Sequence, residues 1–299
     1  MNHRAQIRFL PDGHRLHLHD GPIDLIVEAF GPASEMEIAY DAAASRFVAV
    51  LDELCGELTF LRQPCRPEGE WPQGAVARRM TAAVMPYASK YFITPMAAVA
   101  GAVAEEILAV MTSSAHLSRA YVNDGGDIAL HVAPGEQFVI GMVERPDRPS
   151  LFGTTTITAA DPVRGIATSG WRGRSFSLGI ADAVTVLADR ATAADAAATI
   201  IANAVDLPGH PSIMRVRACE LDPDSDLGDR LVTQTVGTLT PKETNIALEN
   251  GMRTAHLLLG LGLIRSAALN LQGQTRVVGA RTGLRVHSHS IGERSLAHA

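Results

Sequence analysis

The feature that most constrains this chain is a succession of short β-type segments, separated by turn residues at close intervals, between residues 119 and 187. Connections this short join antiparallel strands, because a parallel pair needs a crossover of about a dozen residues or more. The segments with strand-like composition are 119–122, 127–132, 137–143, 152–159, 165–167, 174–178 and 183–187. The middle of the chain is therefore predicted to form antiparallel sheet.

Segments rich in alanine and with helical periodicity lie on both sides of this region. Helices are predicted at residues 33–58, 73–84, 95–111, 193–205 and 241–271, and Ser34 is the candidate N-cap of the first. Further strands are predicted at 6–10, 14–19, 23–30, 213–220, 231–237 and 273–279. We expect an α+β fold with mixed, mostly antiparallel sheets covered by long Ala-rich helices, in one two-lobed unit over residues 1–280. Residues 281–299 are expected to form a mobile tail.

The composition argues against several classes of function. A net charge of −6 argues against a nucleic-acid-binding surface. The three cysteines are widely separated and odd in number, which argues against a disulfide framework and favours a reducing cytoplasm. The start of the chain lacks the apolar core of a secretory signal, and Glu105 and Glu106 interrupt the longest apolar stretch, residues 93–111. We therefore expect a cytoplasmic protein without a membrane span or a nucleic-acid partner.

The first stretch with candidate chemistry is the turn from Asn123 to Asp127, which contains two adjacent glycines and two carboxylates. Hairpin-turn chemistry explains every residue in it, because Asp-Gly and Gly-Gly tolerate positive φ and Asn bonds to its own backbone. The alternative is a ligand site. Paired glycines let a bulky ligand approach the backbone, and the carboxylates then hold a cation or a hydroxyl group.

The second stretch, residues 165–176, ends an apolar strand with Thr168, Ser169 and Gly170 and continues with Arg172 and Arg174. Hydroxyl groups and backbone N–H groups at a glycine are suited to phosphate, and the forked donors of arginine are suited to a diphosphate. The simpler interpretation is a Ser-Gly turn followed by a solvated basic loop. The sequence leaves both interpretations open.

The third stretch, residues 188–206, places Asp195 and Thr199 four residues apart in a predicted helix, so that they share one face. Oxygen ligands at this spacing can hold Mg²⁺, which takes a few protein oxygens and completes its shell with phosphate and water. The alternative is helix capping, because Thr192 precedes Asp195 by three residues and an acid in the first turn favours the helix dipole.

The histidines in the first predicted hairpin raise a separate question. His17 and His19 share one strand face, and His14 precedes them. Because the sequence places no third ligand nearby, an exposed polar face is the favoured interpretation over a metal site. The phosphate-loop, dinucleotide-binding, nucleophile-elbow and His-Glu-x-x-His motifs are absent from the sequence.

Taken in order, the three stretches resemble the ApbE-like superfamily of FAD-dependent flavin transferases. "VNDGGDI" is similar to its Asn-x-Gly-Gly-Asp-Ile turn, "IATSG" to its Ala-Thr-Ser-Gly strand end, and "VTVLADRATAADAAATI" to its valine-rich strand with Ala-Asp-x-x-x-Thr. The resemblance implies an ApbE-like architecture and a site for FAD or FMN with Mg²⁺, where the pyrophosphate is cleaved and FMN passes to a protein threonine. It implies that Asp195 and Thr199 are the metal ligands. The residues that would line the flavin cleft are Asn123, Gly125, Gly126, Asp127, Thr168, Ser169 and Gly170.

The chain departs from this family pattern at two places. The His-x-x-Asp-Pro-x-Thr-Gly motif of the transferases is absent between the Thr-Ser-Gly strand and the valine-rich strand, and Ala100-Gly101 stands where the family has Lys-Gly. The sequence therefore predicts an ApbE-like protein that binds a phosphate-bearing small molecule, either as a flavin transferase or as an enzyme with a different small substrate. The alternative is a non-catalytic binding or assembly module that retains the scaffold. Self-association, and the participation of Asp127 or Asp182 beside Asp195, stay open.

Overall fold

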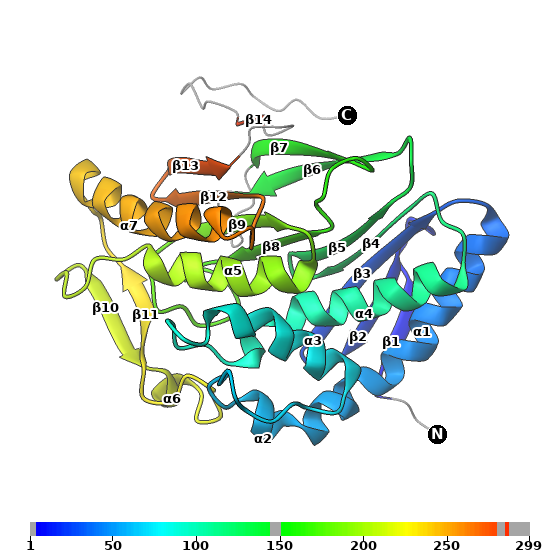
Figure 1. The fold of residues 1–299 in the computed structure, drawn as a ribbon, viewed down its shortest axis with the longest axis horizontal. Coiled ribbons are helices and arrows are strands. Elements are labelled where there is room, and N and C mark those ends of the chain that lie inside the picture. Colours follow the sequence, from blue (N-terminus) through cyan, green and yellow to red (C-terminus); the bar gives the residue numbers. More distant parts are fainter. Residues whose placement is uncertain (1–3, 144–150, 280–284, 287–299) are drawn as a thin grey trace.

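The computed structural model describes residues 4–143, 151–279 and 285–286, and its largest element is a nine-stranded sheet (Figure 1). Its strands, in spatial order, are β1 (Gln6–Phe9), β2 (Leu16–Asp20), β3 (Ile23–Phe30), β4 (Arg119–Asp124), β5 (Asp127–Val132), β8 (Gly165–Ser169), β9 (Ala183–Ala188), β12 (Ser266–Leu271) and β13 (Gln274–Gly279). The predicted α+β class with mostly antiparallel sheet is confirmed, and the described strand pairings include no parallel pair.

Helices cover one face of this sheet, as Figure 1 shows. The longer ones contact it in two groups: α1 and α4 lie against the β2–β5 part, whereas α5 and α7 lie against the part from β8 to β13. The helices are α1 (Ala33–Gly56), α2 (Leu58–Leu61), α3 (Ala75–Val84), η1 (Met85–Tyr87), η2 (Pro95–Ala98), α4 (Val99–Ser114), α5 (Ala191–Ala204), α6 (Ala218–Leu221) and α7 (Pro241–Gly260).

Two smaller sheets complete the fold. Strands β6 (Gln137–Val143), β7 (Leu151–Thr158) and β14 (Arg285–Val286) form one of them, and β10 (Ile213–Arg217) pairs with β11 (Leu231–Val236) in the other. Ile157 of β7 packs with Leu130 and Ile166 of the large sheet in a small buried cluster. These side chains point away from the helices, so the small sheet covers the opposite face.

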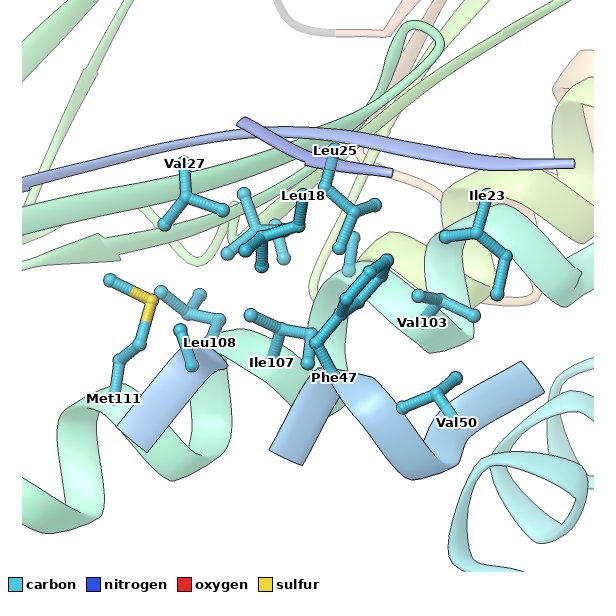
Figure 2. Packing of buried hydrophobic residues seen from close by; sticks show 14 of the residues in the cluster. Leu18, Ile23, Leu25, Val27, Phe47, Val50, Val103, Ile107, Leu108 and Met111 are labelled. Carbon is cyan, nitrogen blue, oxygen red and sulfur yellow. The ribbon is translucent and has the colours of Figure 1, made fainter. Parts of the chain in front are cut away.

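The core between the sheet and the first group of helices is formed by strands in which buried side chains alternate with less buried ones. In β2 and β3 every second side chain is buried, which is the period expected of a strand with one covered face. Figure 2 shows Leu18 and Leu25 from these strands meeting Phe47 of α1 and Ile107 of α4. The first predicted strands and helices are therefore confirmed, with α1 beginning after Pro32 and no side-chain cap from Ser34.

A second buried cluster lies under α5 and α7, where alanine side chains allow close helix packing. Gly101 of α4 touches the start of α5 so closely that a Cβ atom there would lie 2.6 Å from the carbonyl oxygen of Ala191. Both clusters lie against the helix-covered face of the same nine-stranded sheet. Helix α5 contacts α4 on one side and α7 on the other, and so it joins the two halves.

Two predicted elements are wrong, and the strand expected at residues 213–220 ends at Arg217, where the short helix α6 follows. The helix expected over residues 241–271 ends at Gly260, and Ser266–Leu271 forms β12 between β9 and β13. All of its residues are buried, so this strand lacks the polar alternation by which an edge or half-covered strand is recognised. The strand expected at residues 174–178 lies in the connection between β8 and β9. Most of the predicted tail, residues 281–299, lies outside the described residues, and only Arg285–Val286 is seen.

The segment from Pro95 to Ser114 is long and apolar enough to cross a membrane by length and composition alone. In the structure it packs between α1, α5 and the sheet. Glu106 accepts from Arg46 at 2.8 Å and from Arg79 at 3.2 Å, which satisfies a carboxylate that is 8% exposed. The segment therefore serves as a core helix of the described fold.

Candidate functional site

The turn between β4 and β5 presents two carboxylates to the helix-covered face of the large sheet. Asp124 and Asp127 are direct partners in the antiparallel register, and Gly125 and Gly126 between them have φ values of 62° and 115°. The side chain of Asn123 accepts a hydrogen bond from the N–H of Gly126 at 2.8 Å. Turn chemistry thus accounts for Asn123 and both glycines, while the two aspartates point toward α4 and α5.

The end of β8 approaches this turn through its backbone. The N–H of Thr168 donates to Oδ1 of Asp127 at 3.1 Å. The hydroxyl of Thr168 pairs with that of Thr185 at 2.9 Å, on the sheet face opposite the helices. Neighbouring side chains of a strand point to alternate faces. Ser169 therefore faces the helices, and Thr168 contributes its N–H group to this face. Gly170 is required by packing, since a Cβ atom there would lie 2.6 Å from the carbonyl oxygen of Asp182.

Helix α5 brings Asp195 to the same place. Its Oδ2 accepts a hydrogen bond at 3.0 Å from the N–H of Gly101, which lies in the first turn of α4. Backbone N–H groups at a helix start lack partners within the helix and favour a nearby negative charge. The start of α5 itself is bound by Glu105, which accepts from the N–H of Thr192 at 2.9 Å. Asp195 therefore caps α4, and the capping role within its own helix is wrong.

The three aspartates act on one another electrostatically. Burial raises the pKa of Asp124 to about 7, and the guanidinium of Arg174 opposes part of this rise. Burial and the charge of Asp124 raise the pKa of Asp127, and burial followed by the charge of Asp127 raises the pKa of Asp195. Asp124 is 5% exposed, whereas Asp127 and Asp195 keep partial access to solvent. We call Asp124, Asp127 and Asp195 the acidic crevice.

Thr199 lies one turn after Asp195 in α5 and is half-buried on the same helix face. Asp182, by contrast, is engaged elsewhere. It accepts from Arg172 at 2.6 Å, from the indole of Trp171 at 3.2 Å and from the N–H of Gln272 at 2.6 Å. Asp127, and not Asp182, is thus the carboxylate that faces Asp195.

Asp124 and Arg174 are open alternatives in the sequence, and the resemblance places neither of them in the site. The position of Asp124 two residues after Val122 in the alternating strand β4 puts its side chain on the core face. The guanidinium of Arg174 lies 3.7 Å from the carboxylate of Asp124, and its side chain is 65% exposed. Gly125 gives it room, because a Cβ atom there would lie 2.1 Å from Nη2 of Arg174.

A polar cavity of about 320 Å³ lies farther along the same end of the strands. Arg172 and Asp182 form one wall, and the turn from β12 to β13 forms the other. Since Asp182 immediately precedes β9, the cavity and the acidic crevice are separated by about two strand spacings, or about 10 Å. The residues that line the cavity are Arg172, Asp182, Val236, Gly237, Thr238, Asn270, Gln272 and Gly273.

Comparisons with known proteins identify a matching family model and several relatives. A family model described as AbpE bacteria matches residues 7–277. A UPF0280 protein of Methanopyrus kandleri is 40% identical over 129 residues, which are 43% of this chain and 48% of that protein. A UPF0280 protein of Methanococcoides burtonii is 39% identical over 123 residues, 40% of this chain and 49% of that protein. The chain thus spans about half the length of the curated relatives it matches.

Two solved structures are similar over most of the chain but at low scores. The apo form of the Pseudomonas stutzeri flavinyl transferase ApbE has a TM-score of 0.43 and 10% identity, and the match covers 93% of this chain and 94% of that one. The flavin transferase ApbE from Vibrio cholerae has a TM-score of 0.37 and 11% identity, with 93% and 97% covered.

Proposed function

Because the chain belongs to the family described as AbpE bacteria, we propose that it binds a flavin nucleotide, FAD or FMN, or a similar diphosphate ligand, together with Mg²⁺. One observation carries the proposal. The double-glycine turn, the end of β8 and helix α5 meet, since Asp127 accepts from the N–H of Thr168 and faces Asp195. The turn and the end of β8 are 41 residues apart in sequence, and α5 brings a second carboxylate to the same place.

The donor set of the acidic crevice is suited to Mg²⁺. Asp127 uses Oδ1 for the N–H of Thr168, and Asp195 uses Oδ2 for the N–H of Gly101. The second oxygen of each carboxylate, together with the Thr199 hydroxyl implied by the resemblance, would hold the cation. Mg²⁺ binds one or two carboxylates and fills its remaining positions with phosphate oxygens and water. A divalent cation there would offset the carboxylate repulsion that adds to the effect of burial in raising the pKa values of Asp127 and Asp195.

Arg174 and the neighbouring cavity support an anionic, extended ligand. The exposed guanidinium of Arg174 lies 3.7 Å from the carboxylate of Asp124, where its forked N–H groups suit a phosphate bound beside the cation. The cavity about 10 Å away suits the polar remainder of a nucleotide. When bound, Mg²⁺ would neutralise charge on a diphosphate as its anhydride bond breaks. Arg174 would hold the phosphate oxygens while Asp127 and Asp195 fix the cation.

A titration of the purified chain with FAD, with and without Mg²⁺, tests the proposal. We expect Mg²⁺-dependent binding that Asp127→Asn and Asp195→Asn each weaken at least about tenfold, because each removes a charged ligand oxygen. Asp41→Asn serves as the matched control, since Asp41 is exposed on α1 and should leave the affinity unchanged. Absence of binding at high micromolar FAD, or equal binding in EDTA, would contradict the proposal.

Transfer of FMN is tested separately from binding. The purified chain is incubated with FAD, Mg²⁺ and a threonine-bearing acceptor protein, and covalent flavin is sought on the acceptor. Labelling would support a transferase that works without the His-Asp-Pro motif. Binding of FAD without labelling would support the non-catalytic binding module.

A further inference from the structure

The outer face of β2 and β3, opposite the helices, carries a second cluster of groups able to bind a metal. Leu16 and Leu18 point into the core, so His17 and His19 stand together on the other face, both half-buried. Asp24 of β3 is the direct partner of His19 in the antiparallel register and shares that face. Cross-strand partners have Cβ atoms about 5 Å apart, so the carboxylate reaches both imidazoles.

The three side chains are already close enough to share one ion. One ligand atom from each of His17, His19 and Asp24 lies within 4.8 Å of the other two. The shortest separation is 2.6 Å, between Nε2 of His17 and Oδ1 of Asp24, where a hydrogen bond is made. A tetrahedral ion with bonds of about 2.1 Å spaces its ligand atoms by about 3.4 Å. Small side-chain rotations therefore suffice to replace the shared proton by a metal ion.

We propose that His17, His19 and Asp24 form a site for Zn²⁺ or a similar borderline divalent cation, with at least one coordination position left open. Imidazole nitrogen favours Zn²⁺, Ni²⁺ and Cu²⁺, whereas Mg²⁺ favours oxygen. Two histidines and one carboxylate are also the ligand set that leaves room for water or a substrate on zinc. The site differs in chemistry from the acidic crevice and lies on the other sheet face, although Asp24 neighbours Asp124 across β3 and β4.

Arg8 of β1 is expected to compete with a metal ion for His17. Its Nε–H donates to Nδ1 of His17 at 3.3 Å, and the side chain of His17 is 15% exposed. A metal on Nε2 requires the proton on Nδ1, so the hydrogen bond from Arg8 must break before the ion binds. A metal on Nδ1 would displace the guanidinium directly. Either way Arg8 competes with the cation, and Arg8→Ala should tighten binding about threefold or more.

The experiment is a Zn²⁺ titration of the EDTA-treated full chain by calorimetry, with Co²⁺ absorption spectra as a direct probe of nitrogen ligands. We expect one equivalent of Zn²⁺ to bind, with excess Mg²⁺ unable to displace it. His17→Gln and His19→Gln should each weaken binding at least about tenfold, and Asp24→Asn less. His14→Gln is the matched control, because His14 is exposed in the preceding turn and outside the cluster.

The outcomes separate this site from the acidic crevice. Asp195→Asn should leave Zn²⁺ binding intact, since Asp195 belongs to the other face. The proposal is overturned if the wild-type chain binds no Zn²⁺ at millimolar concentration, or if the His17→Gln, His19→Gln double variant binds as tightly as wild type. It is also overturned if Co²⁺ bound to the wild-type chain shows the spectrum of an all-oxygen octahedral site. Thermal melts of each variant check that the sheet remains folded.

Discussion

Replacing Gly165 with alanine is expected to lower the free energy of unfolding by about 3 kcal/mol or more. Gly165 begins β8 directly beneath the first turn of α5. A Cβ atom there would lie 2.1 Å from the backbone nitrogen of Ala191 and from the carbonyl carbon of Arg190. Both contacts are backbone atoms, so relief requires α5 to move as a whole. Because α5 carries Asp195, the variant should also lose Mg²⁺-dependent ligand binding.

Gly260→Ala is the matched control for this prediction. Gly260 is the last residue of α7, and a Cβ atom there would meet no atom within 4 Å. Alanine should therefore stabilise the helix end by about 0.5 kcal/mol, through its lower conformational entropy in the unfolded chain. Urea denaturation followed by circular dichroism measures both variants. Equal stability of Gly165→Ala and wild type would mean that α5 is free to shift and that this contact does not position the acidic crevice.

Strands with one covered face are predicted correctly from their alternation. In β2, β3 and β4, buried and half-buried residues alternate, because helices bury one face and the other face is only partly covered. The wrong prediction of helix over β12 has the opposite cause. Residues 266–271 are buried throughout, and a short apolar run without alternation reads as the continuation of the preceding Leu- and Ala-rich helix. Only the pairing with β9 and β13 identifies it as a strand.

The residues of the candidate sites also fall into those that the sequence can predict and those that it cannot. Spacing along one element is readable, and so Asp195 with Thr199, or His17 with His19, are found from the sequence. Contacts between elements depend on strand register and helix position. Register alone brings Asp24 to His19, and the crossing of α4 and α5 alone gives Asp195 its partner Gly101. A sequence motif also does not show the direction of its side chains. Thr168 and Ser169 are equivalent in the motif, but in β8 the hydroxyl of Thr168 points away from the helices and pairs with Thr185.

Raising the pH should destabilise the chain when divalent cations are removed with EDTA, and Mg²⁺ should reverse the loss. The folded-state pKa of Asp124 is about 7, above its ordinary value of 3.8. A group with a raised folded pKa contributes stability that is fully present below its unfolded pKa and is lost as the pH rises through the folded value. Asp127 and Asp195 shift in the same direction. Unfolding free energy in EDTA should therefore fall between about pH 4 and about pH 8.

Asp195→Asn isolates this effect. An asparagine oxygen can still accept from the N–H of Gly101, so the variant removes the charge and keeps the cap. Near pH 8 in EDTA the variant should be more stable than wild type by about 1 kcal/mol or more, since one pKa unit corresponds to about 1.4 kcal/mol. Near pH 4 the two proteins should be equally stable, and Asp41→Asn should follow wild type at every pH.

Addition of Mg²⁺ should stabilise wild type near pH 8 and leave Asp195→Asn almost unchanged, because binding to the folded state alone adds to its stability. The same carboxylate would then destabilise the fold and bind the cation. A variant that is less stable than wild type in EDTA near pH 8 would mean that Asp195 stabilises the fold as an ordinary helix cap. In that case the charge of the acidic crevice gives no reason to place a cation there, and the magnesium proposal loses its physical basis.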